Sequence, residues 1–145
     1  MNITNEQLES FNNNLKQVLV LRKDLNMRKG KCVSQGAHAS MKAILNQGYM
    51  DEEQNNFIIP LKDNGEITPL GFWLCSNFKK ICVYVNSENE LLEIYNKAVA
   101  MNLPCSLIQD SGLTEFNGIP TYTALSIGPE FEEILDPYTK HLPLL

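Results

Sequence analysis

Apolar residues occur along the chain in two alternating patterns, short continuous runs and longer stretches with helical spacing. Four short runs, rich in Val, Ile, Leu and Thr, predict buried strands. They span residues 17–22, 79–85, 104–109 and 121–127. Between the first two runs, a stretch with helical spacing is followed by Gly48, which predicts a helix over 31–47. Its predicted apolar face consists of Val33, Ala37, Met41 and Ile44.

Capping signals place three further helices. Ser87 and Glu90 form a capping box before a second apolar face, which predicts a helix between the second and third strands. This face consists of Leu91, Ile94, Tyr95, Ala98 and Val99. Thr4 and Gln7 predict a leading helix to about residue 15. Gly128-Pro129 predicts the start of a short last helix that ends before Pro137.

This alternation of strands and helices predicts an α/β fold, a three-layer α/β/α sandwich. Right-handed crossovers make the first three strands mutually parallel, whereas the short link before 121–127 makes the fourth antiparallel. The expected four-stranded sheet is therefore mixed and mostly parallel. Residues 49–78 show no clear period, and Asn64-Gly65 there indicates a tight turn in a hairpin.

Length and composition narrow the class of protein. The chain has 145 residues, 43% of them hydrophobic, which fits one domain over 1–145. It contains no apolar run long enough to span a membrane, and its polar N-terminus is unlike a signal peptide, so we expect a cytoplasmic protein with no membrane partner. Its four cysteines form no CxxC pair and only two histidines are present, which indicates neither a metal site nor a cofactor.

Charge is distributed unevenly between the two ends of the chain. The formal net charge is -5, yet basic residues cluster within ten positions that contain a single acid, Asp24. This basic group consists of Arg22, Lys23, Arg28, Lys29 and Lys31. A compact basic patch on an acidic protein favours an anionic ligand at one place, and a solvated loop is the alternative interpretation.

Two polar segments leave the same predicted edge of the sheet. Lys31 opens the helix after the first strand, and Asp110 ends the third strand. Parallel strands have their carboxyl ends at one edge, where ligands bind, so we expect these two residues to meet. The alternatives are a solvated lysine and an aspartate that serves only the turn before Gly112. Cys32 is a further candidate nucleophile near a helix N-terminus, although a packing role is the simpler interpretation.

At these residues the sequence resembles the archaeal and eukaryotic type of peptidyl-tRNA hydrolase. The resemblance is carried by KGK at 29–31, QxxHA at 35–39, SLIQDSGxT at 106–114 and IGP at 127–129. The matching segments cover roughly two-thirds of the chain in order. The resemblance implies a mixed four-stranded sheet between helices. It also implies hydrolysis of the ester that joins a peptide to the 3′ end of tRNA, which recycles tRNA during translation.

The resemblance also implies roles for individual residues. Lys31, Asp110 and Thr114 fall on the catalytic positions, and Gln35, His38 and Thr123 on supporting ones. We expect Asp110 to orient or deprotonate a water. Basic side chains would bind phosphates of the acceptor stem and the 3′ end, with neither metal nor cofactor. These tRNA-binding candidates are Arg22, Lys23, Arg28, Lys29, Lys79 and Lys80.

Some features depart from the family pattern. Arg28, Ser111 and Glu115 stand where Gly, Ala and Gln are usual. Residues 1–15 form an N-terminal extension, and 49–78 an atypical insertion. A catalytically silent tRNA-binding or regulatory module of the same fold is the alternative function, and a hydrolase that uses a cysteine nucleophile is a third. The sequence leaves both a monomer and a homodimer open.

Overall fold

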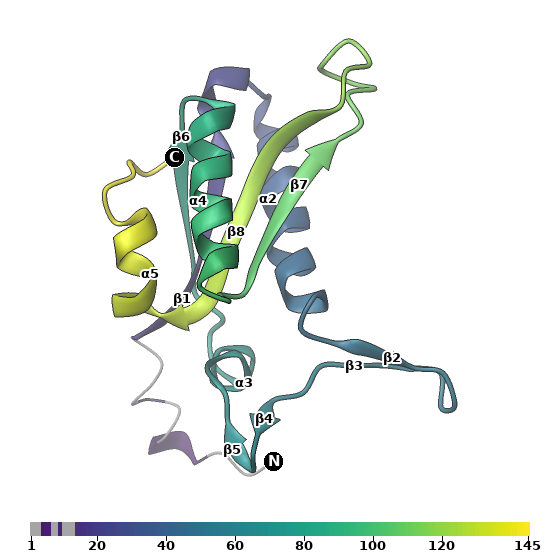
Figure 1. Ribbon diagram of the computed structural model, residues 1–145, viewed down its shortest axis with the longest axis vertical. Coiled ribbons are helices and arrows are strands. Elements are labelled where there is room, and N and C mark those ends of the chain that lie inside the picture. Colours follow the sequence, from purple (N-terminus) through teal and green to yellow (C-terminus); the bar gives the residue numbers. More distant parts are fainter. Residues whose placement is uncertain (1–3, 7–8, 10–13) are drawn as a thin grey trace.

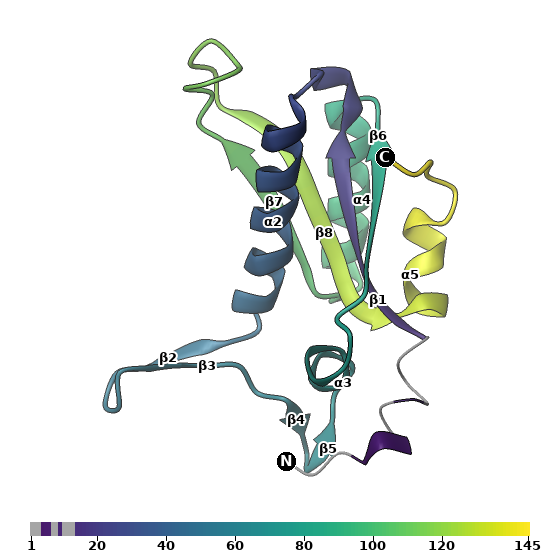
Figure 2. The ribbon, with the colours of Figure 1, turned by 180° about the vertical axis from the view of Figure 1, so that it is seen from behind.

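Four strands form one mixed sheet in the computed structural model, which describes residues 4–6, 9 and 14–145. The spatial order is β6-β1-β8-β7; β1 and β6 are parallel, and β8 is antiparallel to both of its neighbours. Helix α2 covers one face, and α4 and α5 cover the other (Figures 1 and 2). The strands are β1 (Leu15–Arg22), β6 (Lys80–Val85), β7 (Cys105–Asp110) and β8 (Thr121–Phe131), and the helices are α2 (Lys29–Leu45), α4 (Glu88–Ala100) and α5 (Glu132–Thr139).

The predicted strands, the α/β class and the antiparallel fourth strand are confirmed, but the prediction of a mostly parallel sheet is wrong. Because the link between β7 and β8 is short, β8 turns back beside β7, and its free edge then pairs with β1. Only the β1–β6 pair remains parallel. Strand β7 still runs in the direction of β1, so the carboxyl ends of both strands lie at the same end of the sheet.

Alternation along β1 divides the core into two layers. Val18 and Val20 pack with α4 and α5, whereas Leu21 packs beneath α2 with Leu19 at its margin. This alternation is what a strand covered on both faces requires. The larger layer lies on the α4 side and includes Leu125 and other branched residues of β8.

Helix α2 forms where expected but does not bury the predicted face. Val33, Ala37 and Met41 are exposed, and Ile44 alone of the four predicted residues is buried. The buried side consists mostly of small and polar residues, namely Gln35, Gly36, Ala39, Ser40, Ala43 and Ile44. Small side chains let the helix backbone approach the sheet closely enough for two serine hydroxyls from β7 and β8 to donate to the Ala39 carbonyl, at 2.7 and 2.8 Å.

Residues 49–78 fold into two hairpins and a helix. These are β2 (Tyr49–Asp51) with β3 (Asn56–Ile58), β4 (Lys62–Asp63) with β5 (Glu66–Ile67), and α3 (Pro69–Cys75). The predicted tight turn is confirmed, because Asn64 and Gly65 both have positive φ, 50° and 82°. Helix α3 was not predicted; it closes one end of the sheet by packing Trp73 near Leu15. The β2–β3 hairpin projects from the body of the protein (Figure 2).

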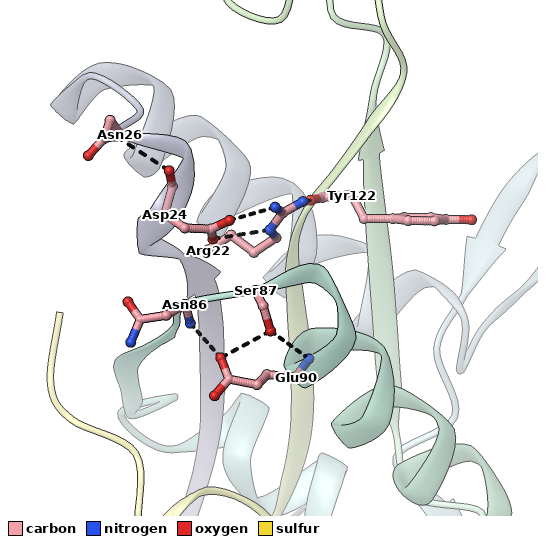
Figure 3. A network of polar contacts seen from close by, with 7 residues as sticks. All are labelled: Arg22, Asp24, Asn26, Asn86, Ser87, Glu90 and Tyr122. Carbon is pink, nitrogen blue, oxygen red and sulfur yellow. Dashed lines mark hydrogen bonds and ion pairs between the residues drawn. The ribbon is translucent and has the colours of Figure 1, made fainter.

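The remaining helix predictions have mixed outcomes. The capping box of α4 is confirmed: Ser87 Oγ accepts from the Glu90 N–H at 3.1 Å, and the Glu90 carboxylate accepts from the Asn86 N–H at 2.7 Å (Figure 3). The predicted last helix is wrong at both ends. Residues 130–131 pair with the start of β1 and so extend β8, and α5 includes Pro137 in its last turn. The leading helix falls largely on residues outside those described.

Among the described residues, no helix combines the length and apolar character that crossing a membrane requires.

Candidate active site

Lys31 and Asp110 meet at the carboxyl edge of the sheet, as strand direction predicts. Lys31 lies in the first turn of α2, and Asp110 is the last residue of β7. The Lys31 ammonium donates to Asp110 Oδ1 at 2.8 Å and to Thr114 Oγ1 at 3.2 Å. The side chains of the ion pair are 15% and 13% exposed, respectively. A lysine, a carboxylate and a hydroxyl therefore form one partly shielded cluster.

Gln35 and Thr123 extend this cluster toward the sheet. Gln35 lies one helical turn after Lys31, and its amide donates to Asp110 Oδ1 at 3.4 Å. The buried Thr123 hydroxyl donates to Gln35 Oε1. In a regular strand, Thr123 and its neighbour Ala124 would face opposite sides of the sheet. The β7–β8 register shifts at this point, so both residues can face α2.

The surroundings of Asp110 favour its ionised form. Lys31 is the main cause that lowers the pKa of this carboxyl, and the Gly112 N–H and Gln35 add to it, while burial acts in the opposite direction. The Gly112 N–H donates to Asp110 Oδ2 at 2.9 Å. Both carboxylate oxygens thus have protein donors, which hold the group in one orientation.

The loop of residues 111–120 holds Thr114 beside the lysine. Gly112 has φ 81°, and a Cβ there would lie 2.2 Å from the Ile119 carbonyl oxygen, so only glycine fits. The Gly118 N–H donates to the Gly112 carbonyl at 2.8 Å and closes the loop. The ring centre of Phe116 lies 5.9 Å from Lys31 Nζ. The Asp-Ser-Gly pattern could have indicated the Gly112 N–H as an Asx-turn donor, whereas no sequence signal indicated Phe116.

Other predicted site residues lie elsewhere. His38 is exposed on α2, and no hydrogen bond or ion pair joins it to the described residues of the cluster. Lys79 forms an ion pair with Glu132 at 2.6 Å, and the Lys80 ammonium lies 4.9 Å from the centre of a Trp73 ring. Because β6 is parallel to β1 and these lysines precede or begin it, they lie at the opposite end of the sheet from the cluster.

The basic residues from the end of β1 to the start of α2 differ in how far protein groups already bind them. Arg22 is largely occupied, since its guanidinium binds Asp24 through two nitrogens at 3.2 and 2.6 Å and donates to the Tyr122 carbonyl at 3.1 Å (Figure 3). Lys23 is exposed, with its ammonium 4.3 Å from the centre of the Tyr84 ring. Arg28 and Lys29 are exposed at the start of α2, beside the cluster.

Cys32 does not have the environment of a nucleophile. Burial and the nearby Glu115 carboxylate raise the pKa of its thiol, which keeps it protonated. Its sulfur donates weakly to the Met27 carbonyl at 3.6 Å and packs with Leu21. Within the described part of the chain, no group of three His, Cys, Asp or Glu side chains is placed to hold a metal ion.

The fold and the cluster together define the class of protein: an α/β domain whose polar site lies where β1 and β7 end, with a fixed, ionised carboxylate beside an ammonium and a hydroxyl. Such a group can orient a water molecule and stabilise negative charge that develops on an oxygen.

Comparison with known proteins identifies the family. Residues 15–145 match the family described as Peptidyl-tRNA hydrolase PTH2. Relatives named "Peptidyl-tRNA hydrolase" include one from Methanocaldococcus jannaschii, 44% identical over 90% of this chain and 100% of its own length. Another, from Methanopyrus kandleri, is 39% identical over 90% of this chain and 97% of its own length. The chain belongs to the peptidyl-tRNA hydrolase PTH2 family, as its motifs indicated.

Proposed function

We propose that this protein hydrolyses the ester bond between a peptide and tRNA and releases free tRNA, as a cytoplasmic enzyme of translation. The names of its relatives support the reaction. The single observation that carries the proposal is the ion pair of Lys31 and Asp110, joined to Thr114 at the carboxyl edge of the sheet. This is the set of residues that the family motifs single out in the sequence.

In the proposed reaction, Asp110 acts on the attacking water. Its carboxylate accepts a hydrogen bond from the water and receives a proton as the water oxygen bonds to the ester carbonyl carbon. The donors from Lys31, Gly112 and Gln35 hold the carboxylate in place, so little reorganisation is needed when the substrate arrives.

Lys31 stabilises the tetrahedral intermediate. Its ammonium lies between Asp110 and Thr114 and donates to the oxyanion that forms from the ester carbonyl. When the intermediate collapses, the bond to the ribose oxygen breaks, and that oxygen takes the proton held by Asp110. The carboxylate is thereby restored, and the ammonium stays charged throughout.

The phosphates of the acceptor stem and the 3′ end bind beside this cluster. Lys23, Arg28 and Lys29 are exposed at the same end of the sheet and supply the positive charge. Arg22 is held by Asp24, and its role is to position the end of β1. Lys79 and Lys80 lie at the start of β6, at the opposite end of the sheet from the site, and are not assigned to phosphate binding.

The test measures how fast the wild-type protein and the Asp110→Asn variant release the N-acetylated amino acid from an N-acetylated aminoacyl-tRNA. We expect Asp110→Asn to lower kcat by about a hundredfold or more, the scale of a general base. Asp136→Asn is the matched control, because Asp136 also pairs with a lysine, Lys16, at 2.9 Å, but at the opposite end of the sheet. It should retain full turnover.

The same assay separates the catalytically silent alternative. A silent module would bind tRNA without releasing the N-acetylated amino acid. The wild-type protein and both variants would then all show no turnover. Release by the wild-type protein that survives Asp110→Asn would instead refute the role assigned to this carboxylate.

A further inference from the structure

The loop that joins β7 to β8 presents large apolar side chains beside the candidate active site. Leu113 and Ile119 are 84% and 64% exposed, and Phe116 is half-buried with its ring near Lys31. Leu113 directly precedes Thr114, whose hydroxyl accepts from the same lysine. Apolar groups at the margin of a polar site that no other described residue covers indicate contact with an apolar part of a ligand.

The loop is fixed with respect to the reacting groups. Three backbone N–H donors constrain it: Gly112 to Asp110, Gly118 to Gly112, and Ile119 to Phe116, at 2.9, 2.8 and 2.9 Å. The space beside Gly112 is filled by the Ile119 backbone. The backbone that carries the apolar side chains therefore keeps a defined position relative to the Asp110 carboxylate. Figure 1 shows this loop beyond the end of β7 and the start of β8.

Charge divides the surroundings of the site into two sides. The connection from β1 to α2 and the first residue of α2 carry the exposed cations Lys23, Arg28 and Lys29. The loop 111–120 contains Glu115 and no basic residue. Burial and the Glu115 carboxylate both raise the pKa of the Cys32 thiol, so Glu115 adds negative charge to this side of the site. Phosphates are attracted to the first side and repelled from the second.

An ester between a peptide and tRNA also has two sides, a polyanionic one and an acyl one. We infer that Leu113, Phe116 and Ile119 bind the side chain of the amino acid that is esterified to tRNA, and that this subsite favours apolar side chains. The inference rests on the proposed function, since it assumes an ester carbonyl at the ion pair of Lys31 and Asp110. The tRNA then leaves the site over the start of α2.

The experiment compares two substrates that differ only in this side chain. One tRNA is charged with either phenylalanine or glycine and then N-acetylated, and kcat/KM is measured for both esters. We expect the wild-type protein to prefer the phenylalanyl ester by about tenfold, a typical gain from one apolar contact. Leu113→Ser should bring the ratio of the two kcat/KM values close to one. Because Leu113 is exposed, this substitution leaves the fold intact.

Met101→Ser is the matched control. Met101 is 64% exposed and follows α4 at the opposite end of the sheet. Its substitution should therefore leave the ratio of the two kcat/KM values unchanged. A second loop variant, Ile119→Ser, should reduce the ratio as Leu113→Ser does.

Three results would overturn the inference in distinguishable ways. Equal losses for both esters in Leu113→Ser would mean that the loop contacts a part common to both substrates, such as the terminal adenosine. A substrate ratio that neither loop variant changes would mean that the acyl side lies elsewhere. No release of either ester by the wild-type protein would overturn the proposed function itself.

Discussion

At the scale of single residues, Asp110 is held by three donors that come from two parts of the chain. The Lys31 ammonium and the Gln35 amide come from α2, and the Gly112 N–H comes from the loop after β7. Lys31 is the one charged donor of the three, and it contributes most to lowering the pKa of this carboxylate. The aspartate is thereby kept ionised and oriented, as the proposed attack by water requires.

The substitution Lys31→Met should raise the pKa of Asp110, because it removes the largest cause of the lowered value and leaves burial in place. A titration of the aspartate carboxyl carbons by NMR measures this shift. Lys97→Met is the control, since Lys97 pairs with Glu93 on the surface of α4 and should leave Asp110 unchanged. A pKa that is equal in the wild-type protein and Lys31→Met would contradict the assignment.

The same shift gives a pH dependence of stability. The pKa of Asp110 is lower in the folded state than in the unfolded chain, so its contribution to the free energy of unfolding is present above the unfolded value of about 3.9. This contribution is lost as the pH falls through the pKa that Asp110 has in the folded state. The stability difference between the wild-type protein and Lys31→Met should therefore shrink in acid.

Strand direction and the motifs were enough to predict that Lys31 and Asp110 meet. The contact between Gln35 and Thr123 was not predictable by alternation, because a register shift in β8 decides which face Thr123 takes. The hydrogen bond from Arg22 to the Tyr122 carbonyl also depends on a strand that is distant in sequence. Contacts set by pairing register or by tertiary neighbours lie beyond what local pattern can predict.

At the scale of elements, the β7–β8 loop depends on the backbone of Gly112. Its positive φ and the 2.2 Å approach of a Cβ to the Ile119 carbonyl mean that Gly112→Ala must distort the loop. We expect a loss of about 1–3 kcal/mol in the free energy of unfolding, measured by urea denaturation. Turnover should also fall, since the Gly112 N–H orients Asp110.

Gly30→Ala is the matched control for that substitution. Gly30 is helical, and a Cβ there meets nothing within 4 Å, so alanine should be neutral or stabilise by up to about 1 kcal/mol. Equal effects of the two alanine substitutions would refute the steric role of Gly112.

Some element boundaries are set by local residues and others by tertiary packing. The strands and α4 were predictable because their apolar runs and capping residues act locally. The buried face of α2 was not, because close packing selects Gly36 and Ala39 over the larger Val33 and Met41. The end of β8 was extended by pairing with Leu15, which no local signal encodes.

At the scale of the whole molecule, an acidic protein must bind a polyanion through a local charge distribution. The formal net charge is -5, but the end of the sheet that holds the Lys31–Asp110 pair carries Lys23, Arg28 and Lys29 in exposed positions. The opposite end carries acidic residues of α5, two of which already bind Lys16 and Lys79. Association with tRNA should therefore be directional and sensitive to salt.

The salt dependence of tRNA binding tests which end the tRNA contacts. Each phosphate contact contributes roughly 0.7–0.9 to the slope of log Kd against log salt concentration. The double variant Arg28→Gln with Lys29→Gln should thus reduce the slope by about 1.5. The double variant Lys79→Gln with Lys80→Gln removes the same charge at the far end and should leave the slope unchanged. Because the net charge is identical in the two variants, a general electrostatic effect would lower both slopes equally. A lower slope in the Lys79 and Lys80 variant alone would place the tRNA across the opposite end of the sheet.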